Sequence, residues 1–189
     1  DAIAEKYPEK LAMIHLDKNK VERRFTFLDI KKESARCANY FLSLGIKKGD
    51  KVMLVLKRHY QFWFAMIALH KIGAIAIPAT YQLREHDFVY RFNAAGVSAI
   101  LCTSDGDCAD IVDRVQGECP TLNLKVLVGG KKEGWRDFDA EYGFFKSSFR
   151  RTPDTPSGDE PALMFFSSGT TGNPKMVEHK HTYGLGHFL

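Results

Sequence analysis

Residues 51–103 read KVMLVLKRHYQFWFAMIALHKIGAIAIPATYQLREHDFVYRFNAAGVSAILCT. Short apolar runs alternate here with longer segments whose apolar residues recur at helical spacing. Parallel neighbouring strands need a crossover between them, and a helix of about ten residues supplies it. The stretch therefore predicts an α/β fold with a mainly parallel sheet flanked by helices. The expected elements are a strand over Lys51–Leu56, a helix over Tyr60–Ile72, a strand over Ala74–Ala79, a helix over Arg84–Ala95 and a strand over Ala99–Thr103.

The same alternation continues towards the C-terminus. A helix over Asp107–Gln116 and a strand over Leu124–Val128 are expected, followed by a weaker amphipathic segment over Trp135–Phe145. Residues 147–160 contain several charges together with Pro, Ser and Gly, which is typical of a linker. The apolar run Pro161–Phe166 after it predicts a further buried strand.

The N-terminal part predicts a small hairpin and one helix. The strand-like runs Leu11–Asp17 and Val21–Phe27 flank a short polar turn. Thr26 is followed three residues later by Asp29, as in a capping box, and Gly45 is placed to end the helix.

Composition excludes several classes of protein. With 44% hydrophobic residues, the 189-residue chain has ample material for a core. The net charge of +4 is scattered, which argues against a nucleic-acid partner. The four cysteines show no metal or disulfide spacing, so a reducing, cytoplasmic location is expected. The apolar region 62–79 is interrupted by charged residues, Gly and Pro, so we expect no membrane span.

Residues 167–175 read SSGTTGNPK and follow the strand predicted over Pro161–Phe166. Glycines let a backbone turn and expose its N–H groups, hydroxyls add donors, and a lysine adds a mobile positive charge. A Walker P-loop would need four residues between its glycines and Lys-Ser/Thr directly after the second. Here two residues separate the glycines, Asn173-Pro174 precedes Lys175, and Met176 follows it. The loop suits a polyphosphate without being a Walker P-loop.

The string SSGTTGNPKMV resembles the signature of the adenylate-forming ligases, which comprise acyl-CoA synthetases, luciferases and peptide-synthetase adenylation domains. Members usually read Ser/Thr-Ser-Gly-Thr-Thr-Gly-x-Pro-Lys-Gly-Val, so Met176 is the one visible departure. Pro-Lys-Met-Val followed by Glu178-His179 looks like the branch of short- and medium-chain acyl-CoA synthetases. By this resemblance the loop embraces the β- and γ-phosphates of ATP, a role carried over to Ser167, Ser168, Gly169, Thr170, Thr171, Gly172 and Lys175.

The resemblance implies that the parent enzyme activates a carboxylic acid as an acyl-adenylate and passes it to coenzyme A, with Mg²⁺ delivered with ATP. Adenylation domains or luciferase-like ligases with another acceptor, and a nonenzymatic nucleotide-binding module, remain alternatives. The chain begins without Met and ends in an apolar stretch, so it is expected to be a fragment. It would be a partial N-terminal domain with a hairpin and helix (1–50), an alternating region (51–146), a linker (147–160) and the loop with its flanks (161–189). The C-terminal domain and the catalytic residues of the family would lie in the remainder of the enzyme, so no catalytic residue is assigned here.

Other candidate residues favour structural roles. On a strand, His179 and His181 would share one face, and His187 follows, but no carboxylate or thiol completes a metal site, so none is expected. The cluster Phe62, Trp63, Phe64 and Met66 is expected in the core and not in a pocket. Cys102 lies in a predicted strand and is also expected in the core.

Overall fold

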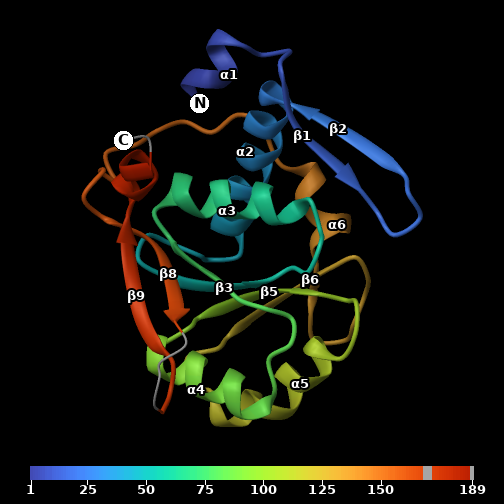
Figure 1. Ribbon diagram of the computed structural model, residues 1–189, viewed down its shortest axis with the longest axis vertical. Coiled ribbons are helices and arrows are strands. Elements are labelled where there is room, and N and C mark those ends of the chain that lie inside the picture. The colour runs from blue at the N-terminus through green and yellow to red at the C-terminus, as the bar shows by residue number, and fades with distance from the viewer. Residues whose placement is uncertain (168–171, 188–189) are drawn as a thin grey trace.

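The computed structural model describes residues 1–167 and 172–187. Within these ranges the chain forms a seven-stranded sheet and a separate two-stranded hairpin (Figure 1). The strands are β1 (Leu11–Leu16), β2 (Glu22–Thr26), β3 (Lys51–Val55), β4 (Ile75–Pro78), β5 (Ala99–Thr103), β6 (Leu124–Val128), β7 (Arg136–Asp137), β8 (Pro161–Ser167) and β9 (Lys175–Lys180).

The strand order of the large sheet is β7-β6-β5-β3-β4-β8-β9. Every neighbouring pair is parallel except β8 and β9, which are antiparallel. The predicted α/β fold with a mainly parallel sheet and a small N-terminal hairpin is therefore confirmed. The helices are α1 (Ala2–Lys6), α2 (Phe27–Ser43), α3 (Gln61–Ile72), α4 (Glu85–Ala95), α5 (Cys108–Val115) and α6 (Phe138–Glu141), with 3-10 turns η1 (Gln116–Glu118), η2 (Tyr142–Phe144) and η3 (His181–His187).

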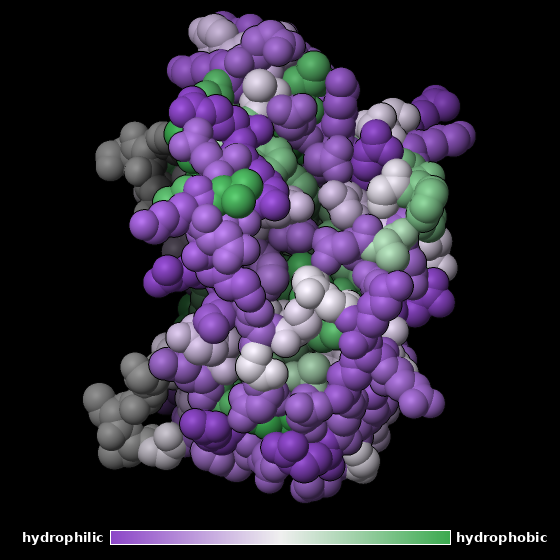
Figure 2. All heavy atoms as spheres, turned by 90° about the vertical axis from the view of Figure 1, so that its right-hand side faces the viewer, coloured by the Kyte–Doolittle hydropathy of each residue, from purple (hydrophilic) through white to green (hydrophobic). Residues whose placement is uncertain are grey.

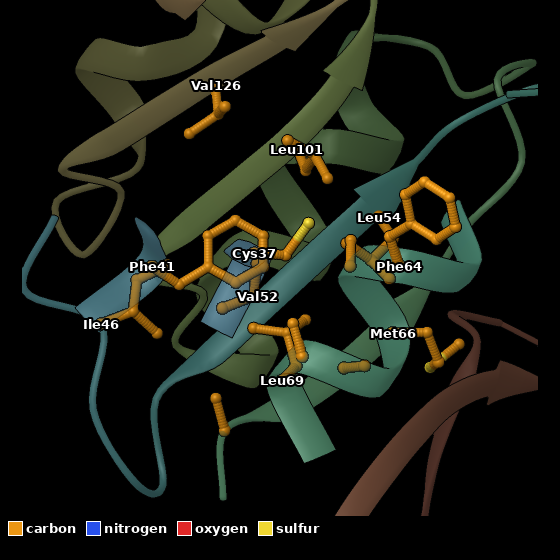
Figure 3. Packing of buried hydrophobic residues seen from close by; sticks show 14 of the residues in the cluster. Cys37, Phe41, Ile46, Val52, Leu54, Phe64, Met66, Leu69, Leu101 and Val126 are labelled. Carbon is orange, nitrogen blue, oxygen red and sulfur yellow. The ribbon is translucent and has the colours of Figure 1, made fainter. Parts of the chain in front are cut away.

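Helices cover both faces of the sheet, with α2 and α3 on one side and α4 and α5 on the other (Figure 1). Successive strand residues point to opposite faces, so Val52 and Leu54 of β3 join the core under α2 and α3, while Met53 joins the core over α4 and α5. Phe41 and Phe64 fill the first core from their helices (Figure 3). This two-sided burial explains why the strands read as continuous apolar runs.

The N-terminal hairpin and the cap of α2 agree with the sequence prediction. In the hairpin turn, Asp17 Oδ1 accepts hydrogen bonds from the backbone N–H groups of Asn19 and Val21, each at 2.9 Å. The Asp29 N–H donates to Thr26 Oγ1 at 3.1 Å, and the Thr26 N–H donates to Asp29 Oδ2 at 2.8 Å, which completes the capping box. Both features depend on neighbours in sequence, which is why the pattern predicts them.

The region after β6 forms three short elements, whereas its amphipathic pattern predicts one segment. Residues 135–145 form the two-residue strand β7, the short helix α6 and the turn η2. Cys102 is fully buried, as expected for a core residue. In the part of the chain that the structure describes, no helix is both long and apolar enough to span a membrane.

Candidate functional site

Strands β8 and β9 form an antiparallel hairpin, and residues 168–174 lie between them in the sequence. Strand β8 runs parallel to β4, with Ala76 opposite Leu163, so it ends at the same edge as the other parallel strands. This confirms that the glycine-rich segment leaves the carboxyl end of a parallel strand, where ligands of open α/β sheets collect. The antiparallel return through β9 was not predicted. It places Ser167 directly opposite Lys175 in the ladder.

The structure describes three of the seven predicted phosphate-binding residues. Ser167 is exposed, and its hydroxyl donates to the backbone oxygen of Lys175 at 3.3 Å. Gly172 has a φ of 84°, a left-handed conformation that strains most other residues, and a Cβ there would meet no atom of the described residues within 4 Å. The remaining four, Ser168, Gly169, Thr170 and Thr171, lie outside the described residues.

Lys175 is the first residue of β9 and its side chain is exposed. Within residues 1–167 and 172–187, no carboxylate forms an ion pair with it. A lysine without a protein counter-charge can neutralise an anionic ligand without first breaking an internal contact. This arrangement has the donor chemistry that a polyphosphate needs.

Helix α4 packs against both ends of the loop, which sequence reasoning missed. The hydroxyl of Tyr90 donates to the backbone oxygen of Pro174 at 2.8 Å. Its ring lies edge-on to Phe166 with 6.2 Å between ring centroids, and the Arg91 guanidinium lies 5.4 Å from the same Phe166 ring. These contacts join segments more than seventy residues apart, so no local pattern signals them.

The histidines after the loop do not both lie on a strand, so the condition under which they would share one face is not met. His179 lies in β9 and packs against the rings of Phe165 and Tyr183, whereas His181 begins η3. His181 contacts His70 of α3, with 5.4 Å between ring centroids. The side chain of His187 lies outside the described part. Among the described residues, no group of three or more His, Cys, Asp or Glu side chains is placed to hold a metal ion.

Burial controls the protonation of the His70–His181 pair. Desolvation, followed by the neighbouring His181, lowers the pKa of His70 to about 4. Desolvation also lowers the pKa of His181, although Glu160 opposes the shift. The Nε2 atoms of both rings are buried and have no hydrogen-bond partner among the described residues. The contact therefore favours the neutral form of both rings, and a low pH destabilises it because it favours protonation of the rings.

Acid is expected to destabilise the protein through His70. Its pKa falls from 6.5 in the unfolded chain to about 4 in the fold, so between these values the unfolded state binds more protons. Stability is retained above pH 6.5 and is lost as the pH falls towards 4, by on the order of 3 kcal/mol. Urea unfolding across this window should show a smaller loss for His70→Leu. His86→Leu is the control, because that side chain is 84% exposed, and an equal loss in the wild type and His70→Leu would contradict the assignment.

A separate cavity of about 620 Å³ opens at the carboxyl ends of β3 and β4. Its walls come from β1, the start of α3 and the loops after β3 and β4. The face of the molecule in Figure 2 is mostly hydrophilic, with small hydrophobic areas. Trp63 lines this cavity and is 53% exposed, so its expected place in the core was wrong. Phe62 also lines it, while Phe64 and Met66 are buried in the core as predicted.

His59 lines this cavity and connects the segment after β3 to the end of the neighbouring strand β5. His59 Nε2 lies 2.7 Å from Thr103 Oγ1 at the end of β5, and 3.7 Å from Asp105 Oδ2. Burial lowers the pKa of His59, and the nearby Asp105 acts in the opposite direction. From β3 the chain crosses over to β4 on one side, and from β5 it crosses over to β6 on the other side. Open α/β sheets form a ligand-binding crevice at such a reversal of strand order. Sequence reasoning assigned no site here, although Thr103 ends a predicted strand and His59 and Asp105 each follow one.

Known proteins resemble this chain in both sequence and fold. A model of the family described as AMP-binding enzyme matches residues 1–187. The chain belongs to this family. An acyl-coenzyme A synthetase, ACSM5, described as mitochondrial, is 40% identical over 168 residues in Rattus norvegicus and 39% identical over 168 residues in Homo sapiens. Each alignment covers 87% of this chain and 28% of the relative, so the chain spans less than a third of their length.

Solved structures of low identity share the fold of this family member. An anthranilate CoA ligase, AuaEII, in complex with anthranoyl-AMP, superposes with a TM-score of 0.83 at 21% identity, over 96% of this chain and 34% of that chain. Acetoacetyl-CoA synthetase from Streptomyces lividans superposes with a TM-score of 0.81 at 21% identity, over 95% and 29% respectively. The described fold is therefore shared with about a third of the chain of each of these CoA ligases.

Proposed function

We propose that the complete protein is an AMP-forming acid–thiol ligase that activates a carboxylic acid with ATP and transfers the acyl group to coenzyme A. The observation that carries this proposal is the loop ending at Lys175, at the carboxyl end of β8 in a chain of the AMP-binding enzyme family. Relatives described as acyl-coenzyme A synthetases support coenzyme A as the acceptor. The division into residues 1–50, 51–146, 147–160 and 161–189 of a partial N-terminal domain is part of the same proposal.

The chemistry explains why such a loop is needed. In the reaction, the carboxylate attacks the α-phosphate of ATP and pyrophosphate leaves, so negative charge grows on the departing group. Donors already fixed in position stabilise this charge without reorganising. Lys175 would supply the positive charge, and Ser167 and Gly172 would supply donors at the two ends of the turn, together with Ser168, Gly169, Thr170 and Thr171. Mg²⁺ would accompany ATP as the counter-ion of its phosphates.

The described residues fit a triphosphate on chemical grounds. Lys175 is exposed and Gly172 leaves open space on the side where a side chain would stand. A bulky residue at Gly172 would combine backbone strain with loss of that space. We assign no metal ligand and no catalytic acid, base or nucleophile to this chain.

The proposal also concerns the cellular compartment of the complete protein. The cysteine pattern favours the cytoplasm, and the four cysteines are free thiols. The relatives described above as mitochondrial favour mitochondria instead. Fractionation of cells that express the complete gene product with a C-terminal tag would decide between the two compartments.

The 189-residue chain alone is expected to bind ATP weakly and to catalyse no adenylation. It spans 28% of the length of the relatives, so most groups that hold the adenosine and the acid would lie elsewhere. Carboxylate-dependent exchange of labelled pyrophosphate into ATP measures the first step directly. Exchange by the isolated chain would contradict this prediction.

Product analysis of the complete protein tests the proposed function itself. Incubation with ATP, Mg²⁺ and a panel of carboxylic acids, with and without coenzyme A, should yield AMP and an acyl-CoA thioester for at least one acid. Adenylate formation without thioester would favour a ligase with another acceptor. Nucleotide binding without either product would favour a nonenzymatic module.

A further inference from the structure

Helix α4 holds the C-terminal end of the loop through one hydrogen bond. The Tyr90 hydroxyl donates to the Pro174 carbonyl at 2.8 Å, and Tyr90 is half-buried between α4 and β8. Within the described residues, another side-chain hydrogen bond runs from Ser167 Oγ to the Lys175 oxygen at 3.3 Å, beside the backbone ladder that pairs these two residues. The Tyr90 contact is therefore the shorter of the two side-chain bonds that fix this backbone.

This hydrogen bond also fixes the start of Lys175. The peptide group between Pro174 and Lys175 is planar, so holding its oxygen towards α4 directs the N–H of Lys175 the opposite way. The Cα of Lys175, and hence the origin of its side chain, belongs to the same rigid plane. The Tyr90 hydroxyl therefore helps to orient the peptide group that leads into Lys175, where the ladder between β8 and β9 begins.

The donor itself is held in place by its neighbours. Arg91 is paired with Asp87 at 2.8 Å, and Asp87 also accepts the backbone N–H of Arg84 at 3.0 Å in the first turn of α4. The Arg91 guanidinium and the Tyr90 ring both lie against Phe166, the residue that precedes Ser167 in β8. The helix therefore contacts the strand before the turn and the backbone after it.

We propose that Tyr90 is a positioning residue for ATP, acting through the Pro174 carbonyl on the orientation of Lys175. This inference rests on the proposed function, because it assumes that Lys175 contacts the phosphates. Positioning matters because small displacements of a charge that stabilises a developing anion reduce its effect. The hydroxyl of Tyr90 is not proposed to touch the nucleotide.

The test compares Tyr90→Phe with Tyr40→Phe in the complete protein. Tyr40→Phe removes a similar hydroxyl contact, to Glu141 Oε2 at 2.9 Å, on the other face of the sheet. For Tyr90→Phe we expect the KM for ATP to rise about five-fold, as one neutral hydrogen bond allows, with the KM for the acid unchanged. Equilibrium binding of a nonhydrolysable ATP analogue should weaken by the same factor. Tyr40→Phe should alter neither quantity, although it should lower stability.

Three outcomes would overturn the inference while leaving the proposed function intact. One is an ATP affinity of Tyr90→Phe equal to that of the wild type. Another is an equal effect of both variants, and the third is a parallel rise in the KM for every substrate, which a general loosening of the fold would cause. Tyr90→Leu, which also removes the ring against Phe166, should weaken ATP binding at least as much. A wild-type protein without ATP turnover or ATP binding would instead remove the proposed function, on which the inference depends.

Discussion

Lys175→Met in the complete protein is expected to lower kcat/KM for ATP by about 10²–10³-fold, the range typical for loss of one preorganised donor to a developing anion. Methionine keeps the unbranched shape of the side chain and removes the charge. Lys175 is exposed at the start of β9, so the fold should tolerate the change. Pyrophosphate–ATP exchange measures the effect on the first step.

Lys180→Met is the matched control, because Lys180 lies at the other end of β9 and is also exposed. It pairs with Asp159 on the surface at 3.2 Å, a contact that contributes little to stability. We expect its exchange rate to equal that of the wild type. Equal rates for Lys175→Met and Lys180→Met would refute the assignment of a phosphate-binding role to Lys175.

Phe41→Ala is expected to reduce the free energy of unfolding by about 3–5 kcal/mol, because it removes a large side chain from a close-packed core. Phe41 is 1% exposed, and its ring lies 6.3 Å from that of Phe138. Figure 3 shows it between α2 and the sheet, near Ile46 and Val52. Urea unfolding of the 189-residue chain should show a lower midpoint with little change in slope.

Phe144→Ala makes the same chemical change at a surface position. Phe144 is 90% exposed, so the free energy of unfolding should change by less than about 0.5 kcal/mol. Equal losses in the two variants would mean that the described core does not carry the stability of the chain.

The sequence by itself determined the fold class, the order of most elements and the position of the glycine-rich segment 167–175. Alternation between apolar runs and helical periods predicts a parallel sheet, since both patterns arise from residues close in the chain. The capping box of Thr26 and Asp29 and the end of α2 near Gly45 follow from the same local rules. The spacing of the glycines and Lys175 in residues 167–175 is likewise visible without coordinates.

Only the tertiary structure decided which of these segments meet. The antiparallel return of β9, the contact of His181 with His70, the bridge from His59 to Thr103 and the bond from Tyr90 to Pro174 each join distant segments. The last two span 44 and 84 positions. Similarly, Trp63 and Phe64 are adjacent aromatic residues that were both expected in the core, yet Trp63 lines a cavity and Phe64 is buried in the core. Local patterns fix backbone conformation and the buried face of an element, whereas partners across the sheet depend on strand order and helix packing, which no short stretch of one chain encodes.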